Sequence, residues 1–161
     1  MNHKTVSTLL AALLLAAGAY AQGKKSSDDA DQKELFNYVL SMDKVQKFSG
    51  VTKALQPLAK QHPEIQNDPN DAKSIDELVR KFQRYPDAVA VLSKNGFTPR
   101  EYIVAMMTTV QATMAVGMKK SGMYKEYPPE MLKTVSKANL DFVDQHWDEF
   151  QKLAQMSSDD K

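Results

Sequence analysis

Residues 97–120 read FTPREYIVAMMTTVQATMAVGMKK, and this stretch decides the fold. Three adjacent signals start a helix here: Thr98 can cap it, Pro99 fits its first turn, and Glu101 completes a capping box with the threonine. The aromatic residues on either side of this start can pack together as a hydrophobic staple. The apolar residues that follow recur at steps of three and four, namely Ile103, Met106, Met107, Val110, Met114 and Met118. This period predicts one long helix that ends near Gly122.

Two further segments upstream show helical periods. The first begins at Ser41, a possible N-cap, and its apolar stripe contains Val45, Phe48, Thr52, Leu55 and Ala59. Pro57 lies inside this stripe, where it removes a backbone hydrogen bond, so we expect a kink or an early end. The second begins at Ser74, which forms a capping box with Glu77.

This second segment is predicted to break once and then resume. Tyr85-Pro86 interrupts its apolar pattern, and the helix continues until Asn95-Gly96, where glycine can adopt the left-handed conformation that ends a helix. A short separate turn at 35–40 is expected to pack under the first segment.

A last long helix is predicted over 132–153. Its apolar residues are Leu132, Val135, Ala138, Phe142, Val143, Trp147, Phe150 and Leu153. Gly117, in the helix quoted first, leaves room for another helix to cross closely. We find no sustained alternation of apolar and polar residues, which argues against strands. The sequence therefore predicts an all-α fold, an antiparallel helical bundle of four main helices, one of them broken near Pro86.

Residues 1–21 have the order of a cleavable secretory signal. A cationic start at Lys4 precedes an apolar run from 6 to 17 that is rich in leucine and alanine, and Ala19-Tyr20-Ala21 follows. A run of about a dozen residues is too short for a membrane span, which needs roughly 20. We therefore expect cleavage after Ala21, a free and soluble mature protein, and a periplasmic or secreted location.

The rest of the chain divides into three predicted parts. Residues 22–34 and 157–161 are polar and are expected to form a disordered lead-in and a flexible tail, while 35–156 form a single domain. Removal of 1–21 takes away one lysine and no acidic residue, which leaves 20 basic against 20 acidic residues. This balance favours neither nucleic acid nor an anionic membrane as a partner. The absence of cysteine excludes disulfides and thiol chemistry.

His146 and Asn139 are the first candidate site residues. The period of the last predicted helix puts them two turns apart on an inward face, in line with Leu132 and Leu153. Such a pair can contact a ligand or respond to protons, and it can equally be satisfied by hydrogen bonds to neighbouring helices, such as the one containing Gln111. The structural interpretation is favoured, and the histidine spacing predicts no metal site.

The methionines Met106, Met114 and Met118 are the second candidate site. Thioethers are soft ligands for copper(I), and methionine is also an adaptable core filler or a lining for an apolar ligand. A haem bound between Met42 and His146 is a further alternative, because the order of these residues fits a four-helix cytochrome layout. The core-filling interpretation is favoured, and no cofactor is the leading expectation.

The sequence contains no catalytic motif. It has too few glycines for a phosphate loop, no nucleophile elbow and no calcium-binding loop. The leading hypothesis is an exported, non-enzymatic binding or protein-interaction module. The alternatives are a carrier of haem, copper or a small apolar ligand in the bundle core, and an enzyme with a site around His146 and Asn139.

Overall fold

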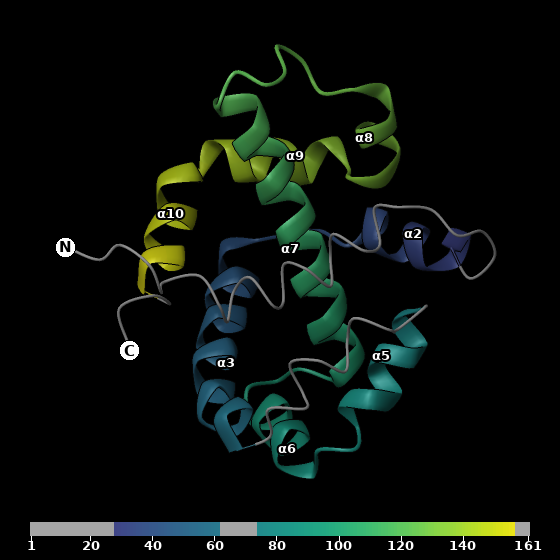
Figure 1. Cartoon of the computed structure of the whole chain (residues 1–161), viewed down its shortest axis with the longest axis vertical. Helices are drawn as coiled ribbons and strands as arrows, with labels where there is room; N and C mark the ends of the chain where they lie inside the picture. Colours follow the sequence, from purple (N-terminus) through teal and green to yellow (C-terminus); the bar gives the residue numbers. More distant parts are fainter. Residues whose placement is uncertain (1–27, 62–73, 157–161) are drawn as a thin grey trace.

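The computed structural model describes residues 28–61 and 74–156, and all regular structure in these two ranges is helical. Figure 1 shows the arrangement of these helices. The signal predicted at 1–21 and the tail predicted at 157–161 lie outside the described residues. No strand occurs within 28–61 or 74–156, so the all-α prediction is confirmed.

The helices follow one another in chain order. Their bounds are α2 Asp28–Asn37, α3 Met42–Gln61, α5 Ile75–Phe82, α6 Pro86–Lys94, α7 Pro99–Lys120, α8 Pro129–Thr134, α9 Lys137–Gln145 and α10 Trp147–Met156. None of these helices is long and apolar enough to cross a membrane, within the part of the chain that the structure describes.

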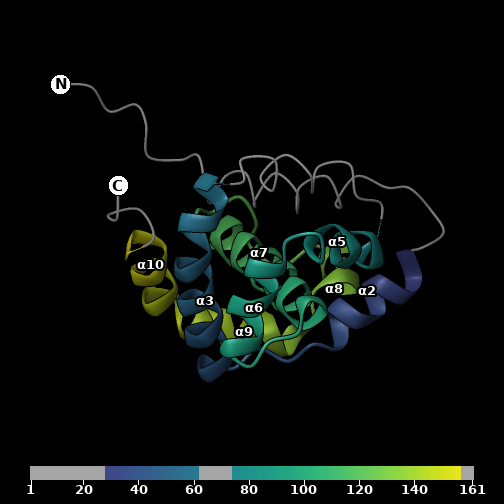
Figure 2. The same cartoon turned by 90° about the horizontal axis from the view of Figure 1, so that it is seen from below.

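Helix α7 is the axis of the fold. It contacts α2, α3, α5, α6 and α9, and Figures 1 and 2 show these helices arranged around it. Seven consecutive residues of its first half, 102–108, are all buried, so neighbours cover every side of the helix there. A helix that is apolar on all sides requires such a position. The stripe predicted from the sequence therefore underestimates how central this helix is.

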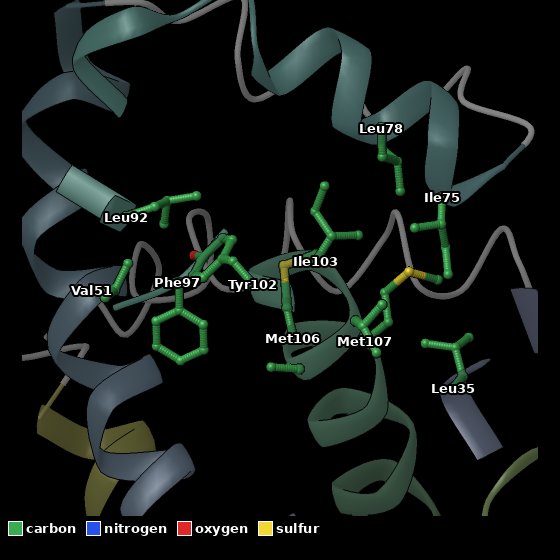
Figure 3. Close-up of a cluster of buried hydrophobic side chains, with 12 residues drawn as sticks. Leu35, Val51, Ile75, Leu78, Leu92, Phe97, Tyr102, Ile103, Met106 and Met107 are labelled. Atoms are coloured by element: carbon green, nitrogen blue, oxygen red, sulfur yellow. The ribbon is translucent and has the colours of Figure 1, made fainter. Parts of the chain in front are cut away.

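Two apolar clusters each include residues of α7. The first surrounds its N-terminal half, and Figure 3 shows Leu35, Ile75 and Leu92 from three other helices converging on Tyr102, Ile103, Met106 and Met107. The second surrounds its C-terminal half, where Ala112 and Val116 pack with Leu140 and Val143 of α9. Because both clusters include residues of one continuous helix, the two halves of the domain are tied together.

The helix-start signals read from the sequence are confirmed. The Thr98 side chain accepts a hydrogen bond from the backbone N–H of Glu101 at 3.1 Å, and Ser74 caps α5 in the same way. The rings flanking the start of α7, Phe97 and Tyr102, meet edge to face with centroids 6.2 Å apart. The break near Pro86 is also found, because α5 ends at Phe82 and α6 begins at Pro86.

Helix α2 differs from the prediction of a disordered lead-in over 22–34. Residues 28–34 belong to this helix, although its sequence has little apolar periodicity. Contacts with other helices hold it: Asp31 accepts a hydrogen bond from the backbone N–H of Ile75 at 2.9 Å, and Leu35 is inserted into the first cluster. Such contacts join residues far apart in the chain, so a local composition argument cannot detect them.

The prediction of a single last helix over 132–153 is wrong. Three helices occupy this region, because Val135 is extended and Ser136 starts α9 by accepting a hydrogen bond from the backbone N–H of Asn139 at 3.3 Å. His146 then ends α9 with backbone angles φ −105° and ψ 24°. Leu132, which the predicted stripe placed inward, is exposed as a result.

Pro57 does not end α3 early, because the helix continues to Gln61. The stripe on this helix includes Val45, which is buried, but the completely buried residue in its middle is Val51 and not the predicted Thr52. Thr52 instead donates from its hydroxyl to the carbonyl of Phe48 at 3.0 Å.

A side chain added at Gly117 and one added at Gly50 should change the free energy of unfolding in opposite directions. A Cβ at Gly117 would lie 3.3 Å from the Trp147 ring, which agrees with the predicted close crossing, whereas a Cβ at Gly50 meets nothing within 4 Å. We expect Gly117→Val to lower the free energy of unfolding by about 1–3 kcal/mol through overpacking. Gly50→Ala should raise it by about 0.5–1 kcal/mol, since alanine is the better helix former. Urea unfolding of both variants measures this, and equal shifts would contradict the crossing.

Candidate functional site

The amide of Asn139 joins two distant parts of the chain. Its Oδ1 accepts a hydrogen bond from the backbone N–H of Leu40 at 3.0 Å, and its Nδ2 donates to the carbonyl of Tyr38 at 2.7 Å. The side chain is 1% exposed. Asn139 therefore binds backbone groups of the link between α2 and α3.

His146 is not beside Asn139. It lies at the other end of α9, seven residues on, which is about 10 Å along a helix axis. Its ring packs on Phe142 at a centroid distance of 4.8 Å, and its Nδ1 lies 4.0 Å from a carboxylate oxygen of Glu149. Its side chain is partly exposed, so the inward polar pair suggested by the sequence is not formed.

The candidate methionines occupy different environments along α7. Met106 lies in the first cluster, Met114 is exposed, and Met118 is partly buried. Met106 and Met118 are twelve residues apart, which is about 18 Å along the helix. These two thioethers therefore cannot bind the same ion. Met114 and Met118 are one turn apart on one side of the helix and are the only neighbours among the three candidates.

Arg100 joins three helices near the start of α7. Its Nε and Nη2 donate to the two carboxylate oxygens of Glu34 on α2 at 2.9 and 2.5 Å, and its Nη1 donates to Asp76 on α5 at 2.5 Å. These hydrogen bonds, above all those to Glu34, raise the pKa of the Arg100 guanidinium. The charge is thereby held permanently at a helix N-terminus, where a cation is otherwise unfavourable.

A second charged group lies at the opposite end of α7. Asp144 of α9 pairs with Lys120 at 2.6 Å and with Lys119 at 3.6 Å. The hydrogen bond from Lys120 lowers the pKa of the Asp144 carboxyl. The two ammonium groups also lie over aromatic rings, Lys119 over Tyr127 and Lys120 over Trp147. This group fastens the C-terminus of α7 to α9.

No family model, curated protein or solved structure matches this chain. The candidate site is therefore assessed from its geometry alone. Within 28–61 and 74–156, the structure contains no group of three or more acidic or histidine side chains arranged to hold a metal ion.

The sequence analysis missed the polar contacts that fix α2. Glu34, Asp76 and Arg100 were not singled out, although one signal pointed to them: arginine in the first turn of a capped helix lies at the positive end of the helix dipole and calls for acidic partners. The partners of Asn139 left no such signal, because backbone groups of residues 38–40 bind it.

The buried hydroxyl of Tyr102 should lower the stability of the folded protein in alkaline solution. Burial raises the pKa of its hydroxyl, an effect only partly offset by the hydrogen bond with Thr52. Below pH about 10 the hydroxyl is neutral in both states, whereas above it only the unfolded state ionises readily, so the free energy of unfolding falls as pH rises. We expect Tyr102→Phe to reduce this fall between pH 9 and about 11, as measured by urea unfolding. Tyr38, whose pKa burial raises to about 12, keeps part of the effect in both proteins.

Equal pH slopes for the Tyr102→Phe variant and the unaltered protein would contradict this assignment. At neutral pH the variant should lose no more than about 1 kcal/mol, the usual value of a single hydrogen bond.

Proposed function

We propose that the chain is exported and acts as a non-enzymatic protein-interaction module. The observation that supports the interaction role is a set of large apolar side chains exposed on or beside two helices that pack against each other, α2 and α8. Phe36 belongs to α2, Val39 lies two residues beyond its end, and Leu132 belongs to α8. Figure 1 shows both helices on the same side of α7.

A contiguous patch of exposed apolar side chains is typical of a surface that binds another protein. We propose that Phe36, Val39 and Leu132 form such a patch, because α2 and α8 pack together. Burial of such side chains against a partner gains about 25 cal/mol for each Å² removed from water. Residues 22–161 contain equal numbers of basic and acidic residues, so the chain has no net charge that would call for a strongly charged partner. The partner that fits is a protein with an apolar surface of its own, bound by the face formed by Phe36, Val39 and Leu132.

Export is tested by the mass of the protein recovered outside the cytoplasm. Cleavage after Ala21 gives a chain that begins at Gln22, which intact-mass spectrometry and N-terminal sequencing both detect. A matched variant, Leu13→Arg, interrupts the apolar run and should stay in the cytoplasm at full mass. Recovery of the uncleaved chain outside the cytoplasm would contradict a cleavable signal.

The binding face is tested by crosslinking in the producing cell. We expect the double variant Val39→Ser, Leu132→Ser to lose a crosslinked partner that the unaltered protein retains. Met123→Ser is the matched control, since Met123 is exposed and apolar but follows α7. Loss in the control and retention in the double variant would refute the assigned face. A crosslinked species of twice the monomer mass that the double variant loses would identify the partner as a second copy.

A haem, copper or small apolar ligand in the bundle core stays a prediction of the sequence. The distance between Met106 and Met118 restricts the copper alternative, because a single ion could be bound by only one of these two thioethers. The absorption spectrum and metal content of protein purified from its natural compartment test it directly.

A further inference from the structure

Methionine is the most easily oxidised side chain that this chain possesses. The sequence has nine methionines and no cysteine. Peroxides convert a thioether to a sulfoxide, and the reaction depends on contact between the sulfur and the oxidant in water. Burial therefore decides which methionines react while the protein is folded.

Four of the five methionines of α7 and its exit fall into two sets, and the fifth, Met118, is partly buried. The outer set is Met114, 41% exposed, and Met123, 63% exposed. The inner set is Met106, 8% exposed, and Met107, 2% exposed. Figure 3 shows the inner set among Leu35, Ile75 and Ile103, in the buried first cluster.

The outer set is positioned so that oxidation does not disturb the core. At 100° for each residue of a helix, Met114 points almost opposite to Ala112 and Val116, which pack in the second cluster. Met123 follows Gly122, whose φ of +81° ends α7, so it lies beyond the helix. A polar sulfoxide at either residue remains in water.

We propose that Met114 and Met123 are oxidation sites for peroxide in the folded protein, and that Met106 and Met107 are protected. The sulfur lone pair attacks one peroxide oxygen, the O–O bond breaks and an S–O bond forms. The second oxygen leaves with a proton as water, so the sulfur is oxidised and the peroxide is reduced. This inference does not depend on the proposed interaction function.

The return reaction requires another protein. A sulfoxide is reduced by thiols, which are oxidised to a disulfide while the oxygen leaves as water. The chain has no thiol. The thiols that reduce the sulfoxides of the outer set must therefore come from another molecule, such as a methionine sulfoxide reductase.

The test is a time course of the purified protein with hydrogen peroxide, followed by peptide mapping. Each oxygen adds about 16 Da. We expect Met114 and Met123 to react at least about a hundredfold faster than Met106 and Met107, because the inner set must wait for a rarely populated open state. In concentrated urea all four should react at similar rates. Circular dichroism should stay helical after the outer set is oxidised.

Two further measurements complete the test. The double variant Met114→Leu, Met123→Leu should lose the fast oxygen additions that map to these two residues, and treatment of the oxidised protein with reductases for both sulfoxide stereoisomers should restore the original mass. Similar rates for both sets in the folded protein would overturn the proposal, as would fast oxidation of Met106 or Met107 in the double variant.

Discussion

Asn139→Ala is expected to lower the free energy of unfolding by about 2–4 kcal/mol. The substitution removes the amide that binds the link between α2 and α3, so the N–H of Leu40 and the carbonyl of Tyr38 each lose a hydrogen bond. A buried polar group without a partner costs about 1–3 kcal/mol. Urea or thermal unfolding followed by circular dichroism measures the loss, and amide exchange at Leu40 should accelerate.

His146→Ala is the matched control on the same helix. It also truncates a polar side chain, but His146 is partly exposed and none of its described contacts is a buried hydrogen bond. A loss below about 1 kcal/mol is expected, as for surface substitutions. Equal losses from the two variants would show that Asn139 does not have the clamping role assigned to it.

Leu35→Ala is expected to cost about 2–5 kcal/mol, the usual range for a buried leucine. Leu35 is 1% exposed and is the side chain by which α2 enters the first cluster. The other interactions described for α2 are polar: the buried hydrogen bond between Asp31 and Ile75, and the partly exposed ion pair of Glu34 with Arg100, which contributes little alone. Amide exchange at Ile75, which donates to Asp31, should report that α2 has been released.

Phe36→Ala tests the same helix one residue further on. Phe36 is 38% exposed, so its truncation should cost less than about 1 kcal/mol despite its larger side chain. A loss as large as that of Leu35→Ala would mean that Phe36 stabilises the fold, and the proposed binding face would then lose a member.

The helix starts could be predicted because their causes are local. Thr98, Ser74 and Gly96 act within one turn of their own positions, through a cap hydrogen bond or a positive φ. The break before Pro86 has the same local origin. An amphipathic period also shows that a helix packs against something, but not how many neighbours surround it, so the full burial of 102–108 was not foreseen.

The errors have two physical origins: distant contacts order α2, whereas a local cap divides the last helix. Residues 28–34 form a helix because Ile75 and Arg100 bind their carboxylates. The last helix divides first at Val135, where the extended valine precedes the Ser136 cap, and both act within one turn. It divides again at His146, which ends α9, and this second division leaves the histidine side chain partly exposed.

The link held by Asn139 also determines when the domain can fold. Leu40 and Tyr38 are 99 and 101 residues from the asparagine that binds them. Contacts between residues this far apart form slowly, because a long loop must close first. A ribosome must therefore have synthesised the chain at least as far as Asn139 before the link between α2 and α3 can reach its native arrangement.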